Sequence, residues 1–253
     1  MNFSEMHFGV DGDSITAWRQ WSYRVYQELG FASHTNVAVG SSVWYKRTIE
    51  TAKGSVTTQE YTNPDFAGIS DGWEETDDLA ELQKRVNNCA YVHIQKYIDM
   101  VHKGEAPVPD VFAFAFGTND ALECIGDASA ALTGKTLEDN EAIDLFTEAG
   151  AARWCIQRIY EEFPACRIFV LTPIQTADPV HNAKNEKVCE NLKQIAGGMS
   201  VQLVDCFHNC GICEKFEVIG GQGKYLRDGL HPDEPGQQLE GRYAAMVMRN
   251  HMF

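Results

Sequence analysis

Short apolar runs alternate along the chain with longer segments in which apolar residues recur every three or four positions. The run 111–116, Val-Phe-Ala-Phe-Ala-Phe, contains no polar residue, which is typical of a central parallel strand covered on both faces. Residues 167–171 have the same character, and shorter strands are predicted near residues 35–39 and 201–204. Another short strand begins near His7 and leads into a Gly-Asp-Ser turn.

Helical periodicity separates these strands. It predicts helices over residues 17–29, 79–102, 141–163 and 185–196, and a last helix that begins near Pro235. In the first helix, the residues interpreted as a stripe facing the core are Trp18, Trp21, Val25, Tyr26 and Leu29. Within the longest one, His93 and His102 are expected on its flank or at its end rather than in a site.

Strands that alternate with helices in this way predict a three-layer α/β/α sandwich with a parallel, doubly wound, flavodoxin-like sheet. The chain shows no repeat, low-complexity segment or linker, so residues 1–253 are expected to form a single domain. Residues 41–78 and 121–140 are irregular. In such sheets ligands bind beyond the carboxyl ends of the strands. Ser14, Gly40 and Asn119 each follow a predicted strand end and should therefore converge.

Composition and charge narrow the class of protein. The chain is 44% hydrophobic and 23% charged, as expected of a globular protein. Its net charge of −15 would repel phosphate backbones, so nucleic-acid binding is not expected. No apolar run approaches the roughly 20 residues that span a bilayer. Residues 1–10 lack the basic end and apolar segment of a signal peptide.

Eight cysteines are scattered along the chain, which suggests reduced, mostly buried thiols and a cytoplasmic protein, or a secreted one if a signal peptide was trimmed. The residues Cys206, His208, Cys210 and Cys213 could ligate zinc. Their spacing matches no common zinc motif, so free thiols or a local disulfide are the favoured interpretation and no metal site is predicted.

Ser14 is the candidate nucleophile. It lies between a strand and a helix N-terminus, where free N–H groups favour negative charge. A serine nucleophile needs a base and a group that orients the base. In Asp228-Gly229-Leu230-His231 the carboxylate can reach Nδ1 of the imidazole and leave Nε2 facing outward. A second motif, G-x-S-x-G at residues 68–72, has no buried strand before it and is interpreted as a surface loop.

Four blocks of the sequence together resemble the SGNH hydrolases, also called GDSL esterases and lipases. In order, they are Gly12-Asp13-Ser14-Ile15-Thr16, Asn36-Val37-Ala38-Val39-Gly40, Gly117-Thr118-Asn119-Asp120 and Asp228-Gly229-Leu230-His231. The resemblance extends from about residue 8 to residue 250.

This resemblance implies a catalytic triad in which Ser14 is the nucleophile, His231 the base and then the acid, and Asp228 the residue that orients His231. It also implies an oxyanion hole formed by the backbone N–H groups of Ser14 and Gly40 and the side-chain amide of Asn119. Acyl transfer would pass through an acyl-serine that water hydrolyses. No metal or organic cofactor is required.

Residues beside these blocks have structural and functional interpretations. Asp13 is expected to brace the turn, and Asp120 to secure the loop that presents Asn119. Trp44 and Tyr45 could equally line a substrate pocket or belong to the core. The acidic composition and the lack of an apolar lid-like helix favour a short acyl or acetyl group on a small or carbohydrate substrate over bulk lipid.

Two other interpretations use the same residues. Asp11-Gly12-Asp13-Ser14-Ile15 resembles the start of haloacid-dehalogenase-type phosphatases, in which Asp11 would be the nucleophile beside magnesium. That interpretation leaves the Asp228/His231 pair unused. The other alternative is a non-catalytic module that binds carbohydrates or esters on the same scaffold.

Overall fold

The computed structural model describes residues 2–18, 20–133 and 143–252. Five parallel strands form its central sheet in the order β2-β1-β5-β6-β7. They are β1 (His7–Gly12), β2 (Ser33–Asn36), β5 (Val111–Ala115), β6 (Arg167–Leu171) and β7 (Gln202–Val204). The sheet and its flanking helices confirm the predicted α/β architecture, and this strand order is the flavodoxin-like one.

The pleat of β5 divides the apolar residues between two cores. Phe112, Phe114 and Phe116 point to one face of the sheet, and Val111 and Ala113 point to the other. Successive side chains of a strand alternate between faces, so one uninterrupted apolar run serves both cores.

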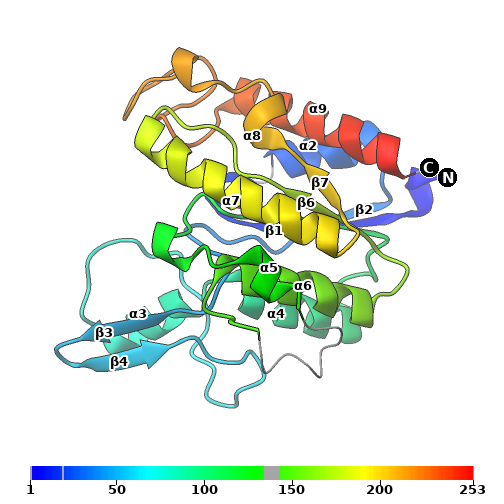
Figure 1. Cartoon of the computed structure of the whole chain (residues 1–253). Helices are drawn as coiled ribbons and strands as arrows, with labels where there is room; N and C mark the ends of the chain where they lie inside the picture. Colours follow the sequence, from blue (N-terminus) through cyan, green and yellow to red (C-terminus); the bar gives the residue numbers. More distant parts are fainter. Residues whose placement is uncertain (1, 19, 134–142, 253) are drawn as a thin grey trace.

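Helices cover both faces of the sheet (Figure 1). The phenylalanine face packs against α4 (Ala90–His102), α6 (Glu148–Glu162) and α7 (Pro179–Gly198). The opposite face packs against α2 (Gln20–Leu29) and α9 (Glu234–His251). None of the helices in the described part of the chain is both long and apolar enough to cross a membrane.

Shorter elements join these layers. They are η1 (Phe3–Glu5), α1 (Ser14–Ala17), β3 (Thr48–Thr51), β4 (Gly54–Thr57), α3 (Leu79–Val86), η2 (Leu122–Cys124), α5 (Ala128–Ala131), α8 (Cys206–Asn209) and η4 (Glu214–Phe216).

The predicted helix over residues 79–102 is wrong as one element, because it consists of two helices. α3 ends at Val86, and α4 begins at Ala90 after Cys89, whose backbone is extended (φ −154°, ψ 158°). Cys89 forms a β-bridge with Val43, and the side chain of Asn88 hydrogen-bonds to a distant loop instead of capping either helix. The apolar periodicity continues through this break, so it gives no sign of it.

Three other predicted elements differ from the structure. Residues 48–57, expected to be irregular, form the antiparallel hairpin β3–β4. The helix predicted from residue 141 begins at Glu148, where the Thr147 side chain caps it; residues 134–142 of these predicted segments lie outside the described residues. α7 begins earlier than predicted, because the Asp178 side chain caps it and Pro179 opens its first turn.

The predicted stripe over residues 17–29 is correct for most of its residues but not for Trp18. α1 and α2 are separate helices, and Trp18 follows α1 with its side chain 43% exposed. Trp21, Val25 and Leu29 lie in the core as expected.

Candidate active site

Ser14 lies at the carboxyl end of β1, directly after the turn that links the strand to α1. Asp13 caps α1 by accepting the N–H of Ile15 at 3.0 Å, so it braces the turn as expected. This cap leaves the Ser14 hydroxyl free to reach across the sheet edge, where its Oγ lies 3.0 Å from Nε2 of His231. The two residues are 217 positions apart in the sequence.

His231 is held by Asp228 from the same loop. Its Nδ1 lies 2.8 Å from Asp228 Oδ2, and its backbone N–H donates to Asp228 Oδ1, also at 2.8 Å. Burial alone would raise the pKa of Asp228, but hydrogen bonds from the backbone and ring of His231 and from Leu230 lower it overall. Asp228 therefore remains ionised and fixes Nδ1 as the donor, which leaves Nε2 free to accept the Ser14 proton.

Gly40 lies beside Ser14, as predicted from the strand ends. A Cβ on Gly40 would be 3.9 Å from the Ser14 Cβ, so a backbone N–H lies near the serine. Asn119 follows β5, and its side-chain Nδ2 donates one hydrogen bond to the carbonyl of Ser42 at 3.0 Å. An amide NH₂ has two hydrogens, so this bond orients the group and leaves a second donor.

Ser42 connects these two parts of the site, although no motif in the sequence marks it as a functional residue. Its buried hydroxyl lies 2.8 Å from the carbonyl of Val39 and 2.9 Å from that of Gly12, while its own carbonyl anchors Asn119. A single residue thus links the end of β1 and the segment after β2 to the turn after β5.

Asp11 is fully buried, so its interpretation as a phosphatase nucleophile is wrong. Its Oδ1 accepts the N–H of Gly12 and contacts Nδ1 of His93 at 3.0 Å. The position expected for His93 is wrong as well. His93 is 1% exposed and lies behind the site rather than on the flank of its helix.

Trp44 and Tyr45 belong to the core, so their proposed place in a substrate pocket is corrected. Trp44 is fully buried against Phe114 and Phe116, with ring centroids 5.4 and 4.9 Å away. Tyr45 is 4% exposed, and its hydroxyl accepts the N–H of Ala121 at 2.9 Å. Both residues support the Asn119 turn from behind, as does Asp120, whose Oδ1 accepts the N–H of Trp44.

Two charged side chains and a tryptophan surround the Ser14–His231 pair. The Trp18 ring lies 4.7 Å from the His231 ring, and the Arg227 guanidinium lies 3.7 Å above Trp18. On the other side, a Cβ on Gly40 would be 3.4 Å from Asp71 Oδ2. Asp71 belongs to the 68–72 segment, which is a loop as predicted. The loop is held by α3, because Ser70 Oγ donates to Glu81 Oε1.

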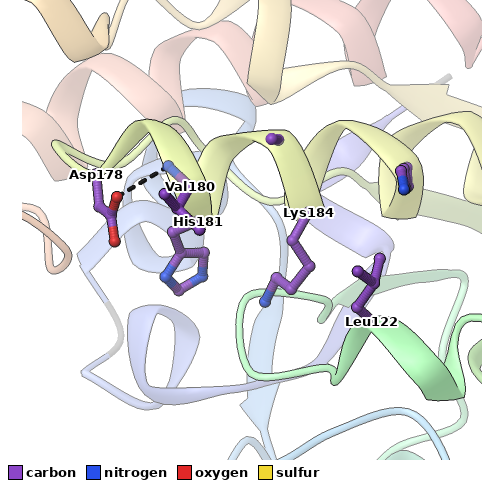
Figure 2. A pocket seen from close by; sticks show the side chains of 7 residues that line it. Leu122, Asp178, Val180, His181 and Lys184 are labelled. Atoms are coloured by element: carbon purple, nitrogen blue, oxygen red, sulfur yellow. Dashed lines mark hydrogen bonds between the residues drawn. The ribbon is translucent and has the colours of Figure 1, made fainter.

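A cavity of about 490 Å³ lies along the start of α7, lined by Leu122, Asp178, Val180, His181, Ala183, Lys184 and Lys187. Figure 2 shows His181 and Lys184 extending from α7 on the side of Leu122. Both donate to the carbonyl of Thr118, at 2.8 and 2.6 Å, next to Asn119. Ala177, the residue before Asp178, donates its backbone N–H to the carbonyl of Gly229 in the loop of His231. This cavity therefore adjoins both the Asn119 turn and the His231 loop.

Several carboxyl groups are buried below Ser14. Burial raises the pKa of Asp13 and Asp120 to about 7 and that of Glu240 to about 8. The nearby Lys184 counteracts this effect at Asp13 and Asp120, and its own pKa is lowered by burial. Glu240 Oε2 has no hydrogen-bond partner among the described residues.

Replacing Glu240 by glutamine should stabilise the fold at pH 8 and have little effect at pH 5. A glutamate titrates near 4.5 when unfolded and near 8 in the native protein, so between these values only the unfolded chain releases the proton. The free energy of unfolding therefore falls as pH rises through this window. At pH 8 we expect Glu240→Gln to raise Tm by at least about 3 °C. Thermal unfolding at both pH values tests this, with the exposed Glu190→Gln as the charge control; equal shifts for both variants would contradict it.

The eight cysteines are free thiols, so the local disulfide considered for the 206–213 segment is absent. Cys206 and Cys210 are buried, and burial raises the pKa of the Cys210 thiol to about 12. Across residues 2–18, 20–133 and 143–252, no three His, Cys, Asp or Glu side chains are grouped so as to hold a metal ion.

A serine, a histidine and an aspartate joined by hydrogen bonds at the carboxyl edge of a parallel sheet form an arrangement typical of serine hydrolases. The family model for GDSL-like lipases/acylhydrolases matches residues 11–243. The chain therefore belongs to the GDSL-like lipase/acylhydrolase family, and ester hydrolysis is the class of reaction that this family supports.

Solved structures share this fold at low sequence identity. A protein from Lactobacillus plantarum is 13% identical with a TM-score of 0.58, over 98% of this chain and 99% of that one. A possible lipase from Chitinophaga pinensis is 16% identical with a TM-score of 0.55, over 97% and 98%. The lipase/acylhydrolase from Enterococcus faecalis is 14% identical with a TM-score of 0.50, over 97% and 96%. The search of curated proteins found no match to this chain.

Proposed function

We propose that this protein is a serine esterase that cleaves a carboxylic ester through an acyl-serine intermediate. The observation that carries the proposal is the continuous hydrogen-bonded series from Ser14 Oγ to His231 (3.0 Å) and from His231 to Asp228 (2.8 Å). Ser14 is the nucleophile, His231 the general base and Asp228 the residue that keeps the imidazole in the required tautomer.

In the first half of the reaction, Ser14 Oγ attacks the ester carbonyl while His231 Nε2 takes the hydroxyl proton. The oxyanion is stabilised by the N–H groups of Ser14 and Gly40 and the free amide hydrogen of Asn119. His231 then gives its proton to the departing alcohol. In the second half, His231 removes a proton from water, which attacks the acyl-serine; His231 then returns this proton to Ser14 Oγ as the acid leaves. These steps need no metal or organic cofactor.

The surroundings of Ser14 favour a short acyl group on a small or carbohydrate alcohol. The cavity on α7 is bordered by apolar surface from Leu122, Val180 and Ala183, and we assign it to one side of the ester. A second hollow, of about 440 Å³, is lined by Trp18, Gln20, Tyr23, Tyr26 and His34. Exposed aromatic rings beside amide and hydroxyl groups suit the alternating apolar and polar surface of a sugar, and Trp18 connects this hollow with His231.

Hydrolysis of short nitrophenyl esters and of acetylated oligosaccharides tests this proposal. Both should be cleaved, and Tyr23→Ala should raise KM for the oligosaccharide by about five-fold or more without changing KM for nitrophenyl acetate. Tyr23 is 48% exposed, so its loss should leave the fold intact. An equal effect on both substrates would contradict the sugar assignment, and no hydrolysis of any ester would contradict the esterase.

The other function that the scaffold supports is a non-catalytic module for carbohydrates or esters. The aromatic hollow beside Trp18 is the observation that favours it. A folded protein that binds acetylated oligosaccharides, hydrolyses none of them and leaves Ser14 unreactive toward a fluorophosphonate would establish the module.

We further propose that residues 1–253 form a single hydrolase domain, which is supported by a family match over residues 11–243. Eight free thiols favour a reducing compartment, the cytoplasm.

Replacing Asp71 by asparagine should increase kcat/KM for neutral esters by about two- to five-fold. The exposed carboxylate lies beside Gly40, so it opposes the negative charge that develops in the proposed oxyanion hole. At separations of a few ångströms in water this repulsion is about 1 kcal/mol. Steady-state kinetics at low and high salt test the effect, which should shrink as salt screens the charge.

Asp65→Asn is the matched control for Asp71→Asn. It removes the same charge from an exposed aspartate of the same irregular stretch. A gain in kcat/KM that is equal in both variants, or a loss in Asp71→Asn, would show that the Asp71 carboxylate does not act on the oxyanion.

A further inference from the structure

Three buried side chains that the proposed mechanism does not use form a hydrogen-bonded series behind Gly40. Asn88 Nδ2 donates to the Gly40 carbonyl at 2.6 Å, and Asn88 Oδ1 lies 3.0 Å from His93 Nε2. His93 Nδ1 lies 3.0 Å from Asp11 Oδ1, which also accepts the N–H of Gly12 at 2.9 Å. Asp11, Asn88 and His93 are each at most 1% exposed. The series therefore links the end of β1 with the turn that contains Gly40.

The hydrogens of this series can be assigned by counting donors. Because Asn88 uses its NH₂ group toward Gly40, its oxygen accepts, and Nε2 of His93 must carry a hydrogen. The contact between His93 Nδ1 and Asp11 Oδ1 then needs another hydrogen, held by the ring or by the carboxyl. Breaking a buried hydrogen bond between a carboxyl group and an imidazole is costly in free energy, because both polar groups then remain in the core without a partner.

The turn at Gly40 needs such support. The next residue, Ser41, has a φ of 61°, in the left-handed region that residues other than glycine rarely adopt. On one side the turn is held by the Ser42 hydroxyl, near the carbonyl of Val39. On the other side it is held by Asn88, and the Gly40 N–H between these two supports is the proposed oxyanion donor.

We propose that Asn88, His93 and Asp11 are positioning residues for the oxyanion hole. Asn88 fixes the Gly40 carbonyl, His93 fixes the orientation of the Asn88 amide, and Asp11 fixes His93. None of the three touches the reacting atoms. The proposal rests on the proposed esterase function, and it explains why an aspartate, a histidine and an asparagine are buried together directly behind Ser14 and Gly40.

The test is the kinetics of Asn88→Ala on a short nitrophenyl ester. We expect kcat to fall about ten- to a hundred-fold because the Gly40 N–H moves away from the oxyanion, while KM changes less than about three-fold. The Ki of phenylboronic acid, whose serine adduct is tetrahedral and anionic, should rise by the same factor as kcat falls.

Asn191→Ala is the matched control for Asn88→Ala. Asn191 is also buried, and its amide donates to the carbonyls of Ile125 and Gly126 rather than to Gly40. It should leave kcat and the boronate Ki unchanged even if Tm falls. Equal losses of kcat in the two asparagine variants, or an Asn88→Ala loss that appears only in KM, would overturn the proposal.

A pair of His93 variants gives a second, independent test. His93→Gln retains an N–H donor for Asn88 Oδ1, whereas His93→Phe keeps a ring but removes both hydrogen bonds. We expect kcat to decrease from the wild type to His93→Gln and further to His93→Phe. Circular dichroism should show first that each variant is folded. A phenylalanine variant as active as the glutamine variant would overturn the proposal. Hydrolysis by the wild type that requires Ser14 keeps this result separate from a failure of the proposed function.

Discussion

Replacing Ser14 by alanine is expected to reduce kcat for ester hydrolysis by about 10⁴- to 10⁶-fold. Without Oγ no acyl-serine can form, so only oxyanion stabilisation and substrate binding remain to accelerate attack by water. KM should change little, because the hydroxyl contributes little to ground-state binding. Burst and steady-state kinetics on a short nitrophenyl ester measure both quantities.

Ser70→Ala is the control for Ser14→Ala. Ser70 occupies the serine position of the G-x-S-x-G pattern, but its hydroxyl donates to Glu81 rather than to a histidine. It should retain hydrolysis close to that of the wild type. Loss of activity in Ser70→Ala together with full activity in Ser14→Ala would show that Ser70, in the 68–72 loop, is the nucleophile.

His231→Ala should reduce kcat almost as strongly as Ser14→Ala. The serine hydroxyl then loses the base that takes its proton, because the Ser14–His231 contact of 3.0 Å is removed. Because the two residues act as one unit, the double variant Ser14→Ala/His231→Ala should be no less active than either single variant. Losses that multiply in the double variant would show that His231 does not act on Ser14.

The chain contains a matched control for the histidine as well. His208 contacts Asp205 three residues earlier at 2.9 Å, with the same spacing as His231 and Asp228. Within the described part of the chain, the hydrogen bonds of the His208 ring go to Asp205 and to no serine. His208→Ala should therefore leave kcat unchanged, and a large loss would mean that the histidine effect is not specific to the site.

The strands and their ends could be predicted from the sequence because local patterns determine them. A parallel strand that is buried on both faces needs a continuous apolar run, such as residues 111–116, and the polar residues that follow such runs must meet at one edge. For this reason Ser14, Gly40, Asn119 and the Asp228/His231 pair converge as expected, although they lie far apart in the chain.

The environment of these site residues could not be predicted, because it depends on contacts between residues that are far apart in the sequence. The helical periodicity of residues 79–102 continues through the break at Asn88. The side-chain amide of Asn88 donates to the carbonyl of Gly40, which lies 48 positions away in the sequence. Asp11 and His93 are 82 positions apart and are hydrogen-bonded to each other inside the core. Trp44 belongs to the core because it packs against Phe114 and Phe116, which lie far from it in the sequence.

The pair Asp205/His208 shows that the Asp-x-x-His spacing predicts a hydrogen-bonded imidazole but does not by itself identify a catalytic histidine. Its spacing and its hydrogen bond are those of Asp228/His231, yet the hydrogen bonds of its imidazole in the described residues go to Asp205 and not to a serine. An aspartate three residues before a histidine thus orients an imidazole at two places, in the loop of His231 and at the N-terminus of α8. Of the two, the loop of His231 places its imidazole against a serine.

Labelling with a fluorophosphonate tests the central claim most directly, because the reagent is attacked by an activated serine in an oxyanion hole and requires no knowledge of the natural ester. Intact mass and peptide mapping should show one adduct per chain, on Ser14. Ser14→Ala should remain unlabelled and Ser70→Ala should be labelled normally. A folded wild-type protein that takes no label, or takes it at a serine other than Ser14, would contradict the assignment of Ser14 as the nucleophile.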